Sequence, residues 1–246
     1  MARPDALRPA HDLAIEALAG VVSRNLGPDG APVNPPMPVA DMAGSMTALA
    51  VVLMVLLRRG QTGRGDFIDI SMQDATMAWL PNVTGSVFAE GRPPRVTEER
   101  SFGGHAFYAI HETADRRHVA LGGVEHEFVG ALLTALDRAD LIAVALGPPG
   151  PGQHPVKALL AETFHSRSRD AWEAWSIGRD LCFAPVPDLQ EVFARPHVAA
   201  RQMILRDGAG NSHIGTPIRY RNEPGQLSFD LPDLDAHRAE LLGPRR

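Results

Sequence analysis

Apolar residues in the first eighty positions follow helical spacing in three stretches and strand-like alternation in one. Residues 11–22 carry apolar side chains at helical spacing, which predicts an amphipathic helix. Residues 46–59 are apolar nearly all round, a pattern typical of a helix buried on most sides. Residues 66–71 alternate and predict a strand, and residues 72–80 predict another helix. Helix, strand and helix in this order indicate an α/β architecture with a parallel sheet.

The composition changes after residue 80, where a second group of elements begins. Residues 91–100 are polar and contain proline, as a linker between domains does. Beyond it the pattern predicts a strand at 118–123, a hairpin turn at 207–211, and helices at 128–136, 156–164, 169–177, between Pro187 and Pro196, and at 234–242. We therefore expect three segments: 1–80 in a large α/β domain, 81–203 as linker and small α+β domain, and 204–246 returning to the first.

Composition and charge exclude several classes of protein. Apolar residues make up 44% of the chain and charged residues 22%, ordinary values for a soluble globular protein. A net charge of −5 provides no basic surface for nucleic acid, and the apolar run 46–57 is too short to span a bilayer. The histidines show no metal-ligand spacing, and the single cysteine, Cys182, lies in an apolar run that predicts a buried thiol. We expect a cytoplasmic protein without a metal site, a membrane span or a nucleic-acid partner.

Three ionisable residues, His11, Asp41 and Glu125, stand in contexts that suit proton transfer. Each lies beside small residues or at the end of a predicted element, where backbone can approach a ligand closely. Together they offer an imidazole and two carboxylates, enough to move a proton on and off carbon. Each also has a structural explanation: Asp41 as the N-cap of the next helix, His11 as a surface or capping residue, and Glu125 as a first-turn acid. The residues alone leave both explanations open.

Several runs of the chain together resemble the type III CoA-transferase family, the CaiB/BaiF-like proteins. They are Ala-Asp-Met-Ala-Gly at 40–44, Arg-Arg-Gly-Gln-Thr-Gly-Arg-Gly at 58–65, Asp-Ile-Ser-Met-Gln-Asp-Ala at 69–75, Pro-Val-Pro-Asp-Leu-Gln-Glu-Val at 185–192 and Leu-Pro-Asp-Leu-Asp-Ala-His-Arg at 231–238. The family includes formyl-CoA and carnitine CoA-transferases and the α-methylacyl-CoA racemases. The resemblance implies a partial Rossmann-like CoA-binding layer within residues 1–80 plus a smaller α+β domain. It also implies that this chain lacks the family's N-terminal portion.

Within this family the site residues resemble those of the racemase branch. Transferases use the aspartate at the position of Asp41 as a nucleophile, whereas racemases use it as an acid/base opposite a histidine paired with a glutamate. The run 8–12 around His11 resembles the racemase histidine segment, and the runs 103–108 and 122–125 resemble the glutamate segment that ends at Glu125. The resemblance therefore implies a catalytic role for these three residues. It also implies ligand-binding roles for Asp12, Gly44, Gly122 and Gly123, with backbone N–H groups near Asp41 and Gly44 stabilising an enolate oxygen.

Three functional hypotheses follow from the resemblance. The first is an enzyme that epimerises the α-carbon of a 2-methylacyl-CoA by two-base proton transfer, with coenzyme A present as part of the thioester substrate and no permanently bound cofactor. The second is a CoA-transferase that moves CoA between carboxylic acids through an aspartyl intermediate. The third is a truncated chain or a subunit of a split enzyme, inactive alone. Because family members form interlocked homodimers, we expect either a homodimer with Asp41 and Glu125 on different chains, or a partner chain that supplies the N-terminal portion.

Overall fold

The structure, a computed structural model, describes residues 8–225 and 227–243. The chain divides into two compact units, with the boundary between Ala184 and Pro185. The segment boundaries that we expect near residues 80 and 203 stay a prediction.

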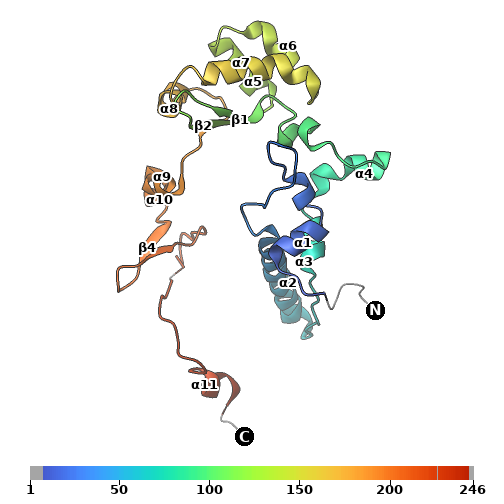
Figure 1. Cartoon of the computed structure of the whole chain (residues 1–246). Helices are drawn as coiled ribbons and strands as arrows, with labels where there is room; N and C mark the ends of the chain where they lie inside the picture. The colour runs from blue at the N-terminus through green and yellow to red at the C-terminus, as the bar shows by residue number, and fades with distance from the viewer. Residues whose placement is uncertain (1–7, 226, 244–246) are drawn as a thin grey trace. The chain divides into compact units, whose positions relative to one another are not determined.

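The first unit begins with three helices that pack on one another: α1 (Asp12–Leu18), α2 (Val39–Thr62) and α3 (Met72–Met77) (Figure 1). A short 3-10 turn, Val22–Arg24, and the turn-rich stretch 25–38 connect α1 to α2. Gly44 allows the close approach of α2 and α3, because a Cβ there would lie 3.0 Å from Cγ of Met72. Helix α4 (Gly85–Glu90) follows after a 3-10 turn at Pro81–Val83.

Helix α2 differs from the buried helix expected at 46–59. It is 24 residues long and begins at Val39, because carboxylates from α1 accept the N–H groups of its first turn. Its apolar side chains are largely exposed, with Met54 64% and Leu57 74% accessible, so the expected burial is wrong for the described residues. By length and composition alone it could cross a membrane, but the core helix of a soluble protein passes the same test.

The strand expected at 66–71 is also wrong. Within the described part of the chain, residues 66–71 belong to no strand. A strand exists only where its backbone N–H and C=O groups pair with a neighbour, and alternation in the sequence does not provide that neighbour. Asp66 instead accepts a hydrogen bond from Arg58 at 2.8 Å, closing the end of α2.

The rest of the first unit is a small sheet covered by helices. Strands β1 (Tyr108–Glu112) and β2 (His118–Gly122) pair antiparallel, and β3 (Phe183–Pro185) lies beside β2, so the strand expected at 118–123 is confirmed. The helices are α5 (His126–Ala135), α6 (Ile142–Ala145), α7 (His154–Phe164) and α8 (Arg169–Ser176). Three of them agree with the helices expected at 128–136, 156–164 and 169–177.

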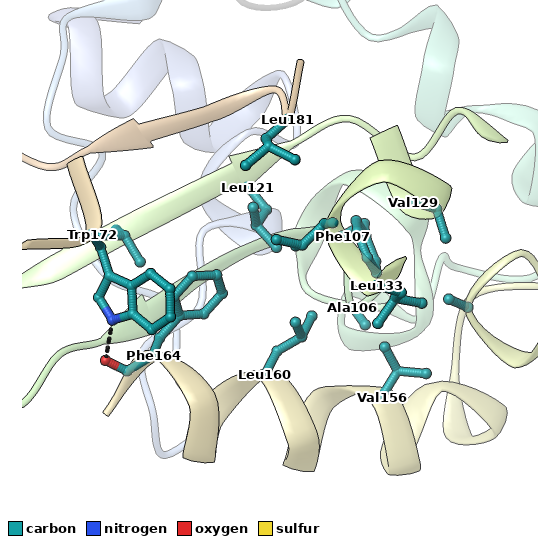
Figure 2. Close-up of a cluster of buried hydrophobic side chains, with 13 residues drawn as sticks. Ala106, Phe107, Leu121, Val129, Leu133, Val156, Leu160, Phe164, Trp172 and Leu181 are labelled. Carbon is teal, nitrogen blue, oxygen red and sulfur yellow. Dashed lines mark hydrogen bonds between the residues drawn. The ribbon is translucent and has the colours of Figure 1, made fainter. Parts of the chain in front are cut away.

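One hydrophobic core joins these helices to the sheet (Figure 2). The residue alternation of β2 sends Val119 and Leu121 inward, and α5 and α7 bury the apolar residues that recur every three or four positions. Trp172 is anchored at its polar end, because its Nε1 donates to the carbonyl of Phe164 at 2.9 Å. The core comprises Ala106, Phe107, Val119, Leu121, Val129, Leu132, Leu133, Ala145, Val156, Leu160, Phe164, Trp172 and Leu181.

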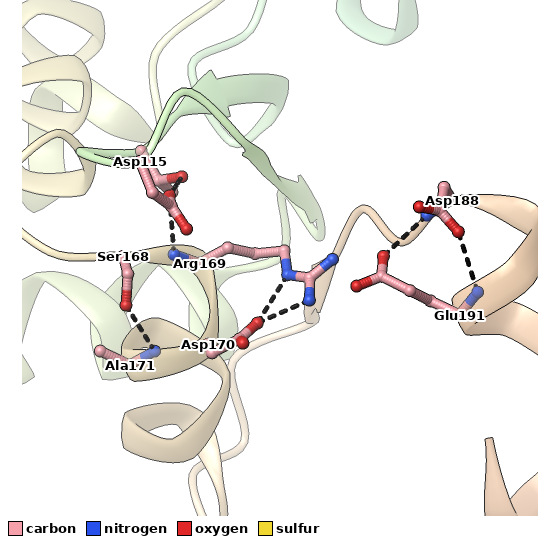
Figure 3. A network of polar contacts seen from close by, with 8 residues as sticks. Asp115, Ser168, Arg169, Asp170, Ala171, Asp188 and Glu191 are labelled. Carbon is pink, nitrogen blue, oxygen red and sulfur yellow. Dashed lines mark hydrogen bonds and ion pairs between the residues drawn. The ribbon is translucent and has the colours of Figure 1, made fainter. Parts of the chain in front are cut away.

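Polar contacts fix the ends of α8 and of the β1–β2 turn (Figure 3). Ser168 caps α8 by accepting the N–H of Ala171 at 3.3 Å, and Asp115 accepts the N–H of Arg169 at 3.2 Å. The expectation that the Cys182 thiol is buried is wrong. Cys182 is exposed and has a φ of 41°, in the left-handed region. The apolar neighbours of this residue predict burial, but they do not determine where the side chain of a residue with left-handed backbone lies.

The second unit consists of short elements. Helix α9 (Leu189–Ala194) begins with a capping box in which Asp188 and Glu191 each accept a backbone N–H (Figure 3), which confirms the helix expected between the two prolines. Helix α10 (Pro196–Ala200) follows, and β4 (Ile204–Arg206) pairs antiparallel with β5 (Ser212–Ile214), the expected hairpin. The final helix, α11 (Arg238–Leu242), is shorter than the range 234–242 expected for it.

Candidate functional site

The corner where α1 meets α2 holds three of the predicted site residues. Asp12 Oδ1 accepts the N–H of Ala40 at 2.9 Å and that of Asp41 at 3.0 Å. Glu16, one turn later on α1, accepts the N–H of Val39 at 2.7 Å. Because the first N–H groups of a helix have no partner within the helix, these two carboxyl groups explain why α2 can begin here. Asp12 thereby connects α1 to the turn that carries Asp41.

Asp41 lies inside α2 as its third residue, so the expected N-cap position is wrong; the N-cap is Pro38. Its carboxyl group is exposed in the first turn, where the helix dipole favours a negative charge. Its N–H is engaged by Asp12 and is therefore not a free donor for an enolate oxygen. This corrects the expected source of oxyanion stabilisation. Gly44 is buried against Met72, one turn further along the helix.

His11 is the N-cap residue of α1 and directly precedes Asp12. Its backbone is extended, its carbonyl accepts the N–H groups of Ala14 and Ile15, and its ring makes no capping hydrogen bond. The side chain is exposed. His11 therefore caps α1, one of the two roles that the sequence allowed, but it does so through its main-chain carbonyl. The imidazole takes no part in the cap.

Glu125 lies at the other predicted part of the site, where β2 gives way to α5. It is the N-cap residue of α5, is exposed, and makes no capping hydrogen bond. Just before it, Gly123 is required by packing, because a Cβ there would lie 2.5 Å from a ring carbon of Phe128. Gly122 donates its N–H to the carbonyl of Cys182 at 3.1 Å. No hydrogen bond or ion pair of the described residues joins Glu125 to His11 or Asp41.

A groove that the sequence analysis missed runs along the open face of β1 and β2. Tyr108 and Ile110 line it, and the register places them opposite Gly122, which has no side chain, and Ala120, which has a single methyl group. Phe102 closes one side of a cleft of about 570 Å³. The sequence shows only that two large apolar residues, Tyr108 and Ile110, stand two positions apart. The strand register is needed to place small residues opposite them.

Two buried histidines belong to the core. Burial lowers the pKa of His105, whose Nδ1 accepts the N–H of Phe107 at 3.1 Å. Burial lowers the pKa of His111 to about 4, and its ring packs against Phe164 with centroids 5.0 Å apart. Both rings are therefore neutral near pH 7. Among the described residues, no group of three or more His, Cys, Asp or Glu side chains is arranged to hold a metal ion.

Comparison with known proteins covers nearly the whole chain. Residues 2–238 match the model of CoA-transferase family III. The chain is 29% identical to the alpha-methylacyl-CoA racemase of Mus musculus and 30% identical to that of Homo sapiens, over 94% of this chain and 61% of each relative. It is 26% identical to the acetyl-CoA:oxalate CoA-transferase of Acetobacter aceti, over 97% of this chain and 62% of that relative.

Solved structures show the same fold. A CAIB/BAIF family protein from Brucella suis matches with a TM-score of 0.74 and 24% identity, over 97% of this chain and 64% of that one. Rv3272 from Mycobacterium tuberculosis matches with a TM-score of 0.77 and 20% identity, over 98% and 65%. The expected α/β class is confirmed. The expected parallel sheet is not, because β1 pairs with β2 and β4 pairs with β5 in antiparallel fashion. The chain spans less than two thirds of the length of these relatives.

Proposed function

Because the chain belongs to CoA-transferase family III, we propose that it acts on an acyl-CoA thioester and epimerises the α-carbon of a 2-methylacyl-CoA. The observation that carries this proposal is the α1–α2 corner, where Asp12 links the segment of His11 to the turn of Asp41. A transferase needs one nucleophilic carboxylate there, whereas a second base beside it suits two-base proton transfer. The similarity to two alpha-methylacyl-CoA racemases agrees with this assignment.

The proposed mechanism uses one base on each face of the α-carbon. Asp41 or His11 removes the α-proton to give an enolate, and the conjugate acid of the other residue returns a proton to the opposite face. Glu125 would orient the imidazole of His11 and stabilise its charged form. Each base would contribute on the order of 10²–10⁴-fold to the rate. The thioester carries the coenzyme A, so no permanently bound cofactor is required.

The groove on β1 and β2 supports an apolar acyl group. Its large side chains, Phe102, Tyr108 and Ile110, are 44%, 40% and 68% exposed. The groove reaches Gly122, three residues before Glu125. An apolar cleft with few polar groups takes an alkyl chain more readily than a dicarboxylic acid, so we assign the substrate to the branched acyl thioesters.

A second subunit would complete the site and cover α2. Between Asp41 and Arg58 this helix has no charged residue, and most of its apolar side chains are exposed. Exposed apolar surface of this extent marks an interface. We propose a cytoplasmic assembly in which the chain forms an interlocked homodimer, with Asp41 and Glu125 from different chains, or pairs with a chain that supplies the family's N-terminal portion.

The first test is proton exchange at the α-carbon. The full chain is incubated with a 2-methylacyl-CoA in D₂O, and α-deuteration is followed by mass spectrometry. We expect exchange that falls by at least about 10²-fold in Asp41→Asn and in His11→Ala. The exposed histidine of β2 provides a matched control, and His118→Gln should exchange like the wild type. Exchange that survives loss of both bases would refute the mechanism.

Mixing inactive variants tests the shared site. If Asp41 and Glu125 come from different chains, dimers formed from Asp41→Asn and Glu125→Gln subunits contain one intact site each. Random reassociation would then restore roughly a quarter of wild-type activity. If one chain supplies both residues, the mixture stays as inactive as its components.

The second candidate function is CoA transfer, which the similarity to the Acetobacter aceti enzyme favours. In that reaction Asp41 attacks the thioester and releases CoA, which leaves a mixed anhydride on the aspartate. CoA then attacks the aspartyl carbonyl, giving an aspartyl thioester and releasing the donor acid, and the acceptor carboxylate runs the same two steps in reverse to leave with CoA. Hydroxylamine would trap the acylated aspartate in the presence of an acid acceptor. Exchange without any acceptor, and no trapped adduct, excludes this alternative. Absence of both activities, restored by adding the family's N-terminal portion, would identify a split-enzyme subunit.

A further inference from the structure

A buried carboxyl group that the proton-transfer scheme does not use lies on α1. The side chain of Glu16 is completely buried, although glutamate is rarely buried without a partner. Its Oε1 accepts the N–H of Val39 at 2.7 Å, whereas its Oε2 is buried without any hydrogen-bond donor among the described residues. A buried oxygen without a partner costs free energy. Its retention at this corner therefore calls for a physical explanation.

Asp12 supplies that explanation from one helical turn earlier on α1. Side chains at positions i and i+4 of a helix lie on the same face, so the two carboxyl groups are neighbours. Between them they bind three consecutive N–H groups, of Val39, Ala40 and Asp41. The start of a helix favours a negative charge, but two ionised carboxylates this close repel each other.

We propose that Glu16 is a positioning residue: with Asp12 it forms a carboxyl clamp that fixes the first turn of α2 and thereby places Asp41 relative to His11. The proposal rests on the acid/base roles proposed above for the latter two residues. The clamp ties together the two segments that carry them, because His11 directly precedes Asp12 and Asp41 is the third residue of α2.

One proton on Glu16 removes the repulsion between the two carboxyl groups of the clamp. Burial, and then the negative charge of Asp12, raise the pKa of Glu16. A protonated carboxyl has an O–H to donate, which gives Glu16 a hydrogen bond to Asp12 and leaves one negative charge facing the helix start. Helix α2 faces the pair with the amides of Val39 and Ala40. Helix α3 contributes Gln73, whose side-chain amide donates to a main-chain carbonyl of α1.

Two substitutions separate the clamp from simple burial. Glu16→Gln keeps an oxygen for Val39 and an N–H₂ donor for Asp12, so it mimics the protonated acid. Glu16→Leu keeps the volume but removes both hydrogen bonds. With the exchange-competent assembly, we expect Glu16→Gln to stay within about threefold of the wild type. Glu16→Leu should lower kcat roughly tenfold or more with little change in KM, because the bases lose their alignment.

Hydrogen exchange provides a readout that does not depend on catalysis. In the full chain, the amides of Val39, Ala40 and Asp41 should exchange roughly tenfold faster in Glu16→Leu than in the wild type or Glu16→Gln. Stability against pH gives a second readout. A glutamate whose folded pKa lies above its ordinary 4.5 stabilises the fold below pH 4.5 and loses that contribution as pH rises. Glu16→Gln should remove this decline.

The outcomes separate the clamp from the proposed function. If the wild type shows no α-proton exchange in any assembly but the amides behave as expected, the clamp stands and the racemase proposal fails. Unchanged amide exchange in Glu16→Leu overturns the clamp. If Glu16→Gln, which mimics the protonated acid, loses activity as Glu16→Leu does, a protonated carboxyl does not position Asp41 and the proposal is wrong. Should Glu16→Leu not fold, the pH comparison of wild type with Glu16→Gln still decides.

Discussion

Acid should weaken the sheet core through one imidazole, that of His111. The residue lies in β1 with only 7% of its surface accessible, and its ring packs on Phe164. Its Nε2 is buried and has no hydrogen-bond partner among the residues that the structure describes. Protonation would place an unpaired charge in this apolar contact. Burial accordingly lowers the pKa of His111 from its ordinary 6.5 to about 4.

The sign and size of the effect follow from this difference. The unfolded chain binds a proton at His111 below pH 6.5, and the folded chain does so only near pH 4, so the contribution is complete above pH 6.5 and is lost as the pH falls toward 4. The full difference corresponds to about 3.4 kcal/mol. Between pH 7 and pH 4.5 the expected loss is about 2.4 kcal/mol.

Urea unfolding at the two pH values measures this loss, with tryptophan fluorescence as the signal because Trp172 and Trp175 lie in the same core. The matched variant is His111→Phe, which keeps a ring against Phe164 but cannot titrate. Other titrating groups act equally in both proteins, so the difference between them isolates the imidazole. A direct NMR titration of His111 with a midpoint near 6.5, or equal pH dependence in both proteins, would refute the reasoning.

Three further predictions concern packing and assembly. Gly123→Ala places a methyl group 2.5 Å from a ring carbon of Phe128, and should destabilise the protein by about 1–3 kcal/mol in thermal unfolding. Trp172→Phe removes the donor to the buried carbonyl of Phe164 and should cost about 1–3 kcal/mol in urea unfolding. Leu57→Gln on α2 should reduce self-association of the full chain, measured by light scattering, because it removes exposed apolar surface.

Each of these predictions has a neighbouring control. Gly122→Ala should be much milder than the change at the next glycine, since its nearest atom, Sγ of Cys182, would be 3.7 Å away. Trp175→Phe changes a partly buried ring in the same cluster and should cost less than the change at Trp172. Leu231→Gln alters a side chain that is 92% exposed outside α2, and should leave association unchanged. Equal effects of variant and control would contradict the corresponding explanation.

Local chemistry made several elements after residue 80 predictable. The helices α5, α7 and α8 follow from apolar residues at helical spacing, and α9 from its Asp188 and Glu191 capping box. The hairpin at 207–211 follows from a glycine-rich turn between extended runs. These elements depend on contacts within a few residues, which the sequence contains in full.

The errors arose where distant residues decide the outcome. Helix α2 begins at Val39 because carboxylates of Asp12 and Glu16, more than twenty positions earlier, accept its first N–H groups. Residues 66–71 form no strand because alternation does not supply a neighbouring strand. The run at Cys182 is apolar, yet its thiol is exposed at a residue whose backbone is left-handed.

For the candidate site, the sequence alone predicts the residue types: an imidazole at His11 and carboxylates at Asp41 and Glu125, each at the end of an element or beside small residues. Three features depend on the folded chain: the carboxylate of Asp12 accepts N–H groups of α2, Glu16 is buried beside it, and a groove opens on β1 and β2. The reason is physical: residue type and local propensity are properties of neighbouring positions, whereas burial and hydrogen-bond partners depend on segments that folding brings together.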